Sequence, residues 1–103
     1  MVTIGNVEIN GRLALAPMAG VTDAAFRLIC REQGAALCVT EMVSSRGLVY
    51  NDRKTAELLY APEGDAPLAA QIFGSDPAVM GEAAPMAVAL SGAQLLDINM
   101  GCP

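Results

Sequence analysis

The sequence has no histidine and no tryptophan, and its aromatic residues are two phenylalanines and two tyrosines. Without histidine, serine–histidine and cysteine–histidine nucleophile pairs are excluded within these 103 residues. Cysteine is also scarce, and the three cysteines (Cys30, Cys38 and Cys102) form no CxxC pair. An odd count in a chain without secretory features argues against a disulfide framework and against a zinc site, so we expect no metal centre. Any cysteine chemistry must work without a local imidazole.

Long hydrophobic runs are absent as well, although 53% of the residues are hydrophobic. No apolar run approaches the ~18 residues that a membrane span needs. The first ten residues lack the charged-then-apolar layout of a signal peptide. We therefore expect a soluble, cytoplasmic protein that does not bind membranes.

Basic residues are also few. The sequence has 6 lysines and arginines and 11 aspartates and glutamates, which gives a net charge of −5. Taken alone, this balance argues against nucleic-acid binding, because phosphate contacts need clustered basic side chains. The basic residues are scattered, apart from the pair Arg53-Lys54.

What the sequence does contain is an alternation of short apolar runs with helical segments. A small hairpin is predicted over Thr3–Ile9, because Gly5-Asn6 suits a tight turn. Apolar runs and turn residues predict strands at 13–16, 37–42, 67–73 and 95–100. Capping residues and helical spacing predict helices at 23–33, 46–59 and 77–91, the second broken near Asn51-Asp52 and the third interrupted by Pro85.

Two of these helices have apolar side chains at helical spacing, which predicts the faces that pack inward. The first face is Phe26, Ile29 and Cys30, and the second is Val79, Ala83, Met86 and Leu90.

The predicted strands are apolar throughout rather than alternating, which is typical of parallel strands covered on both faces. A β-α-β-α-β-α-β order fits either a doubly wound sheet or a (β/α)8 TIM barrel, and a barrel needs eight such units and about 250 residues. We interpret residues 1–103 as an α/β domain that forms the amino-terminal half of a TIM barrel, preceded by the short β-hairpin and truncated after the fourth strand.

Three segments lie at the carboxyl ends of predicted strands, where barrels place their active sites. They are 16–23, 71–77 and 97–103. In the first, small residues around Pro17, Met18 and Ala19 would let a flat ring approach the backbone, although a plain strand end and helix cap is the alternative. The amides of Gln71 and Asn99 can both donate and accept hydrogen bonds, so each could hold a heterocyclic ligand or instead a neighbouring loop.

Cys102 is the most distinctive candidate. Cys30 and Cys38 fall within apolar segments and suit small buried side chains, whereas Cys102 lies between Gly101 and Pro103 after the fourth predicted strand. An ordinary cysteine thiol is largely protonated at pH 7, so it can donate a proton without help from histidine. This position favours a general acid over a nucleophile.

Four stretches resemble the tRNA-dihydrouridine synthase family, and its bacterial B-type branch in particular. They are APMAGVTD at 16–23, EMVSS at 41–45, QIFGSDP at 71–77 and DINMGCP at 97–103. The resemblance runs in register along the whole chain and would cover only the amino-terminal part of such a protein. The first and third motifs are shared by several flavin-binding barrels, whereas DINMGCP is highly specific.

This resemblance implies a TIM barrel that binds FMN, a helical domain after it, and reduction of a tRNA uridine to 5,6-dihydrouridine with NADPH as reductant. It implies that Cys102 is the proton donor, that Pro17, Met18 and Ala19 contact the flavin ring, that Gln71 contacts its pyrimidine edge, and that Asn99 lies beside the uracil. The second half of the barrel and the helical domain would lie beyond residue 103, with much of the basic tRNA-binding surface. Activity is therefore expected of a full-length protein.

Two alternatives stay open at this point. A dihydroorotate-dehydrogenase-like flavin oxidoreductase shares the barrel, FMN and an Asn-x-x-Cys-Pro segment, although the glycine before Cys102 favours the synthase. The other alternative is that these 103 residues alone are an inert fragment.

Overall fold

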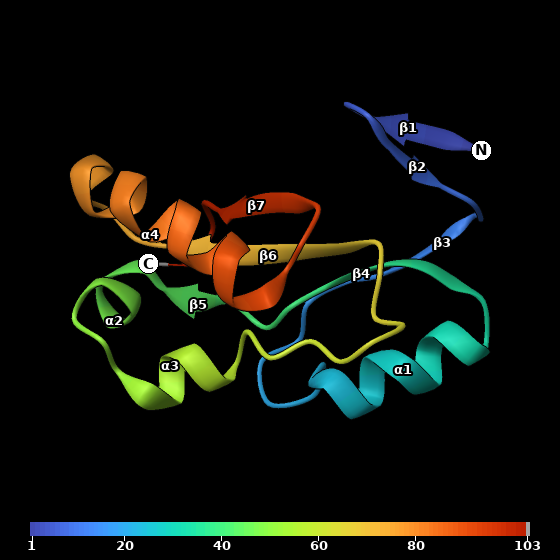
Figure 1. The fold of residues 1–103 in the computed structure, drawn as a ribbon, viewed down its shortest axis with the longest axis horizontal. Coiled ribbons are helices and arrows are strands. Elements are labelled where there is room, and N and C mark those ends of the chain that lie inside the picture. Colours follow the sequence, from blue (N-terminus) through green and yellow to red (C-terminus); the bar gives the residue numbers. More distant parts are fainter. Residues whose placement is uncertain (103) are drawn as a thin grey trace.

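The computed structural model describes residues 1–102 and contains two separate sheets (Figure 1). The smaller sheet is an antiparallel hairpin of β1 (Val2–Ile4) and β2 (Val7–Ile9), in which Ile4 pairs with Val7. Gly5 in the turn has a φ of +59°, a conformation that costs glycine little. The hairpin lies where the sequence predicts a turn.

The larger sheet is wholly parallel. Its strands are β3 (Leu13–Leu15), β4 (Ala35–Val39), β5 (Val43–Ser44), β6 (Leu68–Phe73) and β7 (Leu95–Asn99). Both β4 and β5 pair with one edge of β6, and β7 pairs with the other edge. Taking β4 and β5 as one interrupted strand, four parallel strands follow one another in chain order, as predicted. Within residues 1–102 they form an open sheet that does not close into a barrel.

The interruption between β4 and β5 is a bulge. Val39 pairs with Ala69 and Val43 pairs with Ile72, so four residue steps on this strand (39 to 43) match three on β6 (69 to 72). One extra residue is accommodated between them, which bends the strand next to the end of the sheet. The prediction of one continuous strand at 37–42 is therefore wrong.

Four helices connect the strands. They are α1 (Ala24–Glu32), α2 (Ser45–Val49), α3 (Arg53–Glu57) and α4 (Pro77–Ser91). Asp23 caps α1 and Asp76 caps α4, each by accepting hydrogen bonds from backbone N–H groups of the first turn. The predicted break in the second helical region is present, because Asn51 separates α2 from α3 with a φ of +59°.

The core lies between the sheet and the helices, and small side chains let α4 approach closely. Ala83, Ala87 and Ser91 are the buried residues of α4, whereas Leu90 is exposed. The predicted inward stripe is therefore correct at Ala83 and wrong at Leu90. The inward face of this helix is selected by the size of its side chains, because apolar residues surround the helix on all sides.

Pro85 lies on the exposed side of α4, and the helix continues through it. The carbonyl that loses its helical hydrogen bond belongs to Gly81, four residues earlier, which is also exposed. Water can therefore hydrate that carbonyl, which removes much of the cost of a proline inside a helix.

The buried residue of α1 is a charged one. Arg27 is fully buried, whereas Ile29 is exposed and Phe26 and Cys30 are half-buried. The predicted face of Phe26, Ile29 and Cys30 is therefore wrong at Ile29, and the fully buried position of the helix is Arg27 instead. The reason is the ion pair described below, which draws the arginine face of the helix toward the protein.

Candidate active site

The sequence-predicted site residues lie at one end of the parallel sheet. Parallel strands end at the same edge, so the segments after β3, β5, β6 and β7 are neighbours there. Pro17, Met18 and Ala19 follow β3, Asn99 is the last residue of β7, and Cys102 comes three residues later. The sixth member, Gln71, lies in the second half of β6 and pairs with Asp97 on β7.

The amides of Gln71 and Asn99 belong to one hydrogen-bonded row. Gln71 Nε2 donates to Asp97 Oδ2 at 2.6 Å, and Asn99 Nδ2 lies 3.4 Å from Gln71 Oε1. Asn99 Nδ2 also lies 3.7 Å from the sulfur of Met42, and the backbone N–H of Gln71 donates to Thr40 Oγ1 at 3.0 Å. Two side chains of β7, Asp97 and Asn99, therefore fix the orientation of the Gln71 amide, while Thr40 of the bulge holds the Gln71 backbone and Met42 of the bulge contacts Asn99.

Asp97 was missed by the sequence reasoning. Its carboxylate fixes the Gln71 amide, since only the NH2 group can donate to an acid oxygen. A signal was available, because an aspartate in the middle of an otherwise apolar strand is rarely placed there without a partner.

The segment after β3 is a tight, internally bonded turn. Met18 N–H donates to Thr22 Oγ1 at 3.0 Å, and the Met18 carbonyl accepts from the backbone N–H groups of Val21 and Thr22. Gly20 has a φ of +77° and donates its N–H to Glu41 Oε1 at 2.5 Å. The turn holds Met18 at the surface, where its side chain is exposed.

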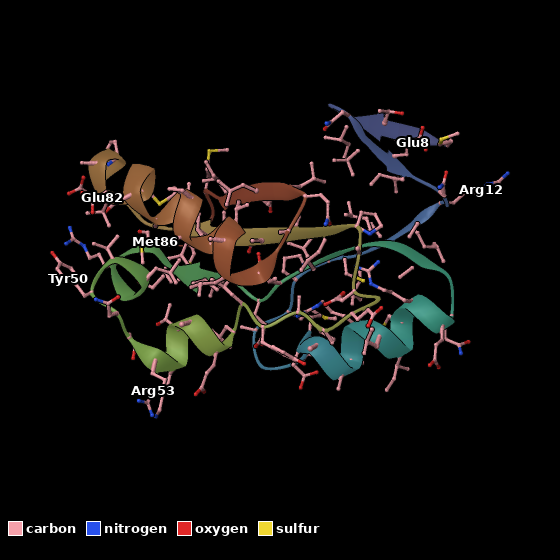
Figure 2. All side chains as sticks on the ribbon, in the orientation of Figure 1. Glu8, Arg12, Tyr50, Arg53, Glu82 and Met86 are labelled. Atoms are coloured by element: carbon pink, nitrogen blue, oxygen red, sulfur yellow. The ribbon has the colours of Figure 1, made fainter. Side chains whose placement is uncertain are left out.

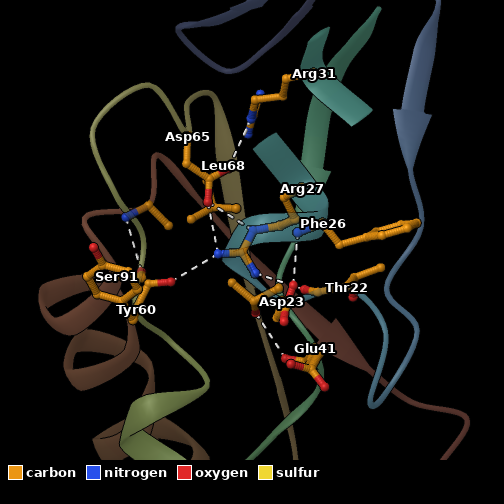
Figure 3. A network of polar contacts seen from close by, with 12 residues as sticks. Thr22, Asp23, Phe26, Arg27, Arg31, Glu41, Tyr60, Asp65, Leu68 and Ser91 are labelled. Atoms are coloured by element: carbon orange, nitrogen blue, oxygen red, sulfur yellow. Dashed lines mark hydrogen bonds and ion pairs between the residues drawn. The ribbon is translucent and has the colours of Figure 1, made fainter. Parts of the chain in front are cut away.

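A buried ionic network contacts this turn through Thr22 (Figure 3). Arg27 Nη2 lies 2.8 Å from Asp65 Oδ2, Nη1 donates to the Thr22 carbonyl at 2.9 Å, and Nη2 donates to the Tyr60 carbonyl at 3.0 Å. Arg31 Nε donates to the second oxygen of Asp65 at 2.9 Å. One carboxylate thus joins two arginines of α1 to the segment before β6, and Arg27 is connected through Thr22 to the Met18 turn.

Cys102 lines a pocket of about 300 Å³ at the same end of the sheet. The other lining residues come from the start of α2 and from the loop between β6 and α4, and they are Ser44, Ser45, Arg46, Phe73, Gly74, Ser75 and Asp76. Asn99 Oδ1 accepts a hydrogen bond from the Gly101 N–H at 2.8 Å, which shapes the chain just before the cysteine. The thiol is half-buried and therefore within reach of a ligand in this pocket.

The remaining cysteines differ from each other. Cys38 is fully buried, as the sequence predicts, whereas Cys30 is only half-buried. Burial raises the pKa of the Cys38 thiol above its ordinary value, because the thiolate would lose its hydration.

We expect Cys38 to resist iodoacetamide in the folded protein at neutral pH, while Cys30 reacts faster. The thiolate is the reactive form, and burial opposes both its formation and access to it. A time course of alkylation followed by peptide mass spectrometry measures both rates, and equal rates would contradict the burial.

The pKa of the Cys38 thiol is higher in the folded state than in the unfolded state. The contribution of this thiol to folding stability is therefore complete below the ordinary thiol pKa and decreases as pH rises above it.

Membrane-spanning helices and clusters of metal ligands are both absent from the described part of the chain. Within residues 1–102, no helix combines the length and hydrophobicity that crossing a membrane requires. In the same range, no three or more cysteine, aspartate or glutamate side chains are grouped as a metal site.

An open, all-parallel α/β sheet with polar side chains and loops gathered at the strands' carboxyl ends fits one part of a TIM barrel. The family model described as dihydrouridine synthase (Dus) matches residues 14–103. The chain therefore belongs to the dihydrouridine synthase family.

Curated relatives agree with this family. A protein from Pseudomonas aeruginosa named tRNA-dihydrouridine synthase B is 50% identical over 103 residues, which is 100% of this chain and 31% of that protein. A protein of the same name from Escherichia coli K12 is 46% identical over 100 residues, covering 97% of this chain and 31% of its own length. The chain thus spans about a third of the relatives it matches. These matches favour the synthase over the dihydroorotate-dehydrogenase-like alternative.

Proposed function

We propose that residues 1–103 form part of an enzyme that reduces uridine to 5,6-dihydrouridine in tRNA, with Cys102 as the proton donor. The observation that carries the proposal is the position of Cys102, in a pocket at the carboxyl ends of β5, β6 and β7 and three residues after the oriented amide of Asn99. Family membership supports the reaction class, and the position of Cys102 supports its role as the acid.

The residues present fit a flavin. A glutamine amide has two N–H donors and an oxygen with two lone pairs. In Gln71, one N–H donates to Asp97, and one lone pair of the oxygen accepts from Asn99. One donor and one acceptor position therefore remain for the pyrimidine edge of the ring. The side chain of Met18 is exposed, and hydrogen bonds within its turn hold the residue in place. Together with its sequence neighbours Pro17 and Ala19, it offers a surface on which the flavin ring could lie.

When bound and reduced by NADPH, FMN would supply the hydride for C6 of the uracil. Cys102 donates its thiol proton to C5, so that the C5–C6 double bond becomes a single bond, and the thiolate regains a proton from solvent. Asn99 lies beside the uracil, where its amide can accept from N3–H or donate to a carbonyl oxygen. Because Asn99 also accepts from Gly101 N–H, the residue that orients the base also orients the acid.

The test is a chimera, called the barrel chimera below, in which residues 1–103 replace the matching segment of the Pseudomonas aeruginosa relative. We expect it to restore dihydrouridine in tRNA of a bacterial strain that lacks its own dihydrouridine synthases, as measured by nucleoside mass spectrometry. The intact relative is the positive control. A purified chimera that carries FMN but restores no dihydrouridine would contradict the proposal.

A further inference from the structure

The pocket beside Cys102 contains a basic side chain that the proposed reaction has not used. Among the described residues that line it, Arg46 is the basic one, and it faces a lining of serines, glycine and Asp76. A cation there increases the local concentration of anionic groups.

The guanidinium of Arg46 is available to a ligand. Its side chain is 59% exposed, and its Nη2 lies 3.7 Å from Oδ2 of Asp76, whose side chain is 43% exposed. Such an exposed, long ion pair contributes little to stability and is easily exchanged for another partner. A phosphate can offer two oxygens to the planar guanidinium, which is a stronger, bidentate arrangement.

The backbone that carries Arg46 is held firmly against the loop after β6. Ser44 caps α2 by accepting from the Gly47 N–H at 3.1 Å, and Ser45 is buried. A Cβ on Gly74 would lie 2.2 Å from Ser45 Oγ, so the two segments meet at a distance that only glycine allows. Arg46 therefore projects from a fixed point on the wall of the pocket.

The other basic residues are placed elsewhere. Arg27 and Arg31 are bound to Asp65, and Lys54 borders a different pocket with Glu41 and Glu57. Figure 2 shows Arg53 pointing into solvent from α3 and Arg12 beside the hairpin, next to the amino end of β3. Of the six basic side chains, Arg46 is the one that the structure brings to the Cys102 pocket.

We propose that Arg46 binds a backbone phosphate of the RNA strand, next to the nucleotide whose uracil lies over Cys102. The inference rests on the proposed function, since it takes Cys102 as the donor to the base. FMN and NADPH also carry phosphates, but the phosphates nearest to a uracil at this thiol are those of its own strand. Arg46 thus supplies a positively charged contact for RNA in a chain whose net charge is −5.

The experiment compares Arg46→Gln, Arg46→Lys and Asp76→Asn in the FMN-loaded barrel chimera with unmodified tRNA at several salt concentrations. For Arg46→Gln we expect the KM for tRNA to rise about 5–10-fold while kcat changes less than twofold, since the contact lies outside the reacting atoms. The slope of log(kcat/KM) against log[salt] should decrease in magnitude by about 0.7–0.9, the value for one phosphate contact. Arg46→Lys should keep most of that slope.

Asp76→Asn removes the competing carboxylate and retains a good cap for α4, so its KM for tRNA should equal or fall below that of the parent. Arg53→Gln is the matched control, because it makes the same charge change at an exposed position away from the pocket and should leave KM unchanged.

An Arg46→Gln variant that behaves like Arg53→Gln would overturn the inference. A rise in the KM for NADPH or in the Kd for FMN, with the KM for tRNA unchanged, would assign the contact to a cofactor phosphate and overturn it as well. Fluorescence anisotropy of labelled tRNA against salt measures the same contact without turnover. A chimera that binds RNA through Arg46 but forms no dihydrouridine would therefore count against the proposed function alone.

Discussion

Replacing Cys102 by alanine in the barrel chimera should slow uridine reduction by about 10²–10⁴-fold, which is the usual contribution of a general acid. FMN binding and NADPH oxidation should stay nearly unchanged, because neither needs the thiol proton. The decisive measurement is single-turnover oxidation of the NADPH-reduced chimera by unmodified tRNA, which isolates the step that uses the acid.

Three further variants test whether this effect belongs to the acid. Cys102→Ser should recover little activity, since a hydroxyl is a far weaker acid than a thiol. Cys30→Ala and Cys38→Ala should lower stability while the single-turnover rate stays near that of the parent. A Cys102→Ala rate within a few-fold of the parent would exclude the cysteine from the mechanism.

Asp65→Asn should be the most destabilising single substitution among those described here. It leaves the fully buried Arg27 and the nearly buried Arg31 without their shared carboxylate. Removing one partner of a buried ion pair typically costs about 3–5 kcal/mol, because the remaining charge stays away from water. With an m-value of about 1–3 kcal/mol/M, the midpoint of urea unfolding should fall by at least about 1 M.

Glu82→Gln provides the control for the Asp65 substitution. It removes the same charge from an outward-facing position on α4 (Figure 2), where substitutions usually change stability by less than about 0.5 kcal/mol. If the two variants unfolded at the same urea concentration, the Arg27–Asp65–Arg31 network would have no role in holding α1 to the segment before β6.

The order of the elements could be predicted from the sequence because local signals agree with the fold. Asp23 and Asp76 cap the starts of α1 and α4, and Gly92 ends α4, as their chemistry predicts. The four apolar runs form the four parallel strand positions of the sheet. The inward faces of the helices could not be predicted in the same way. Burial of Arg27 depends on Asp65, 38 residues later, and no local periodicity records such a distant partner.

The candidate site was predictable as a set of positions and less so as a set of contacts. Met18, Gln71, Asn99 and Cys102 could be placed at one end because each belongs to or follows a parallel strand. The supporting side chains, such as Thr22 and Glu41, act through backbone atoms of other segments. Those hydrogen bonds depend on where main-chain groups lie in three dimensions, and the types of the residues in the sequence do not predict those positions.

The extra residue between β4 and β5 can be regarded as an insertion that the sheet does not need. If Thr40 or Glu41 were excised, Val43 would follow Val39 by three steps and still face Ile72, so the ladder would close in regular register. What would disappear is the bond from the Gln71 N–H to Thr40 Oγ1 or the one from the Gly20 N–H to Glu41. The irregular segment thus provides the contacts that link the Met18 turn and β6 to residues 40–42. We expect natural variants with a shorter segment to keep the sheet and to lose one of these contacts.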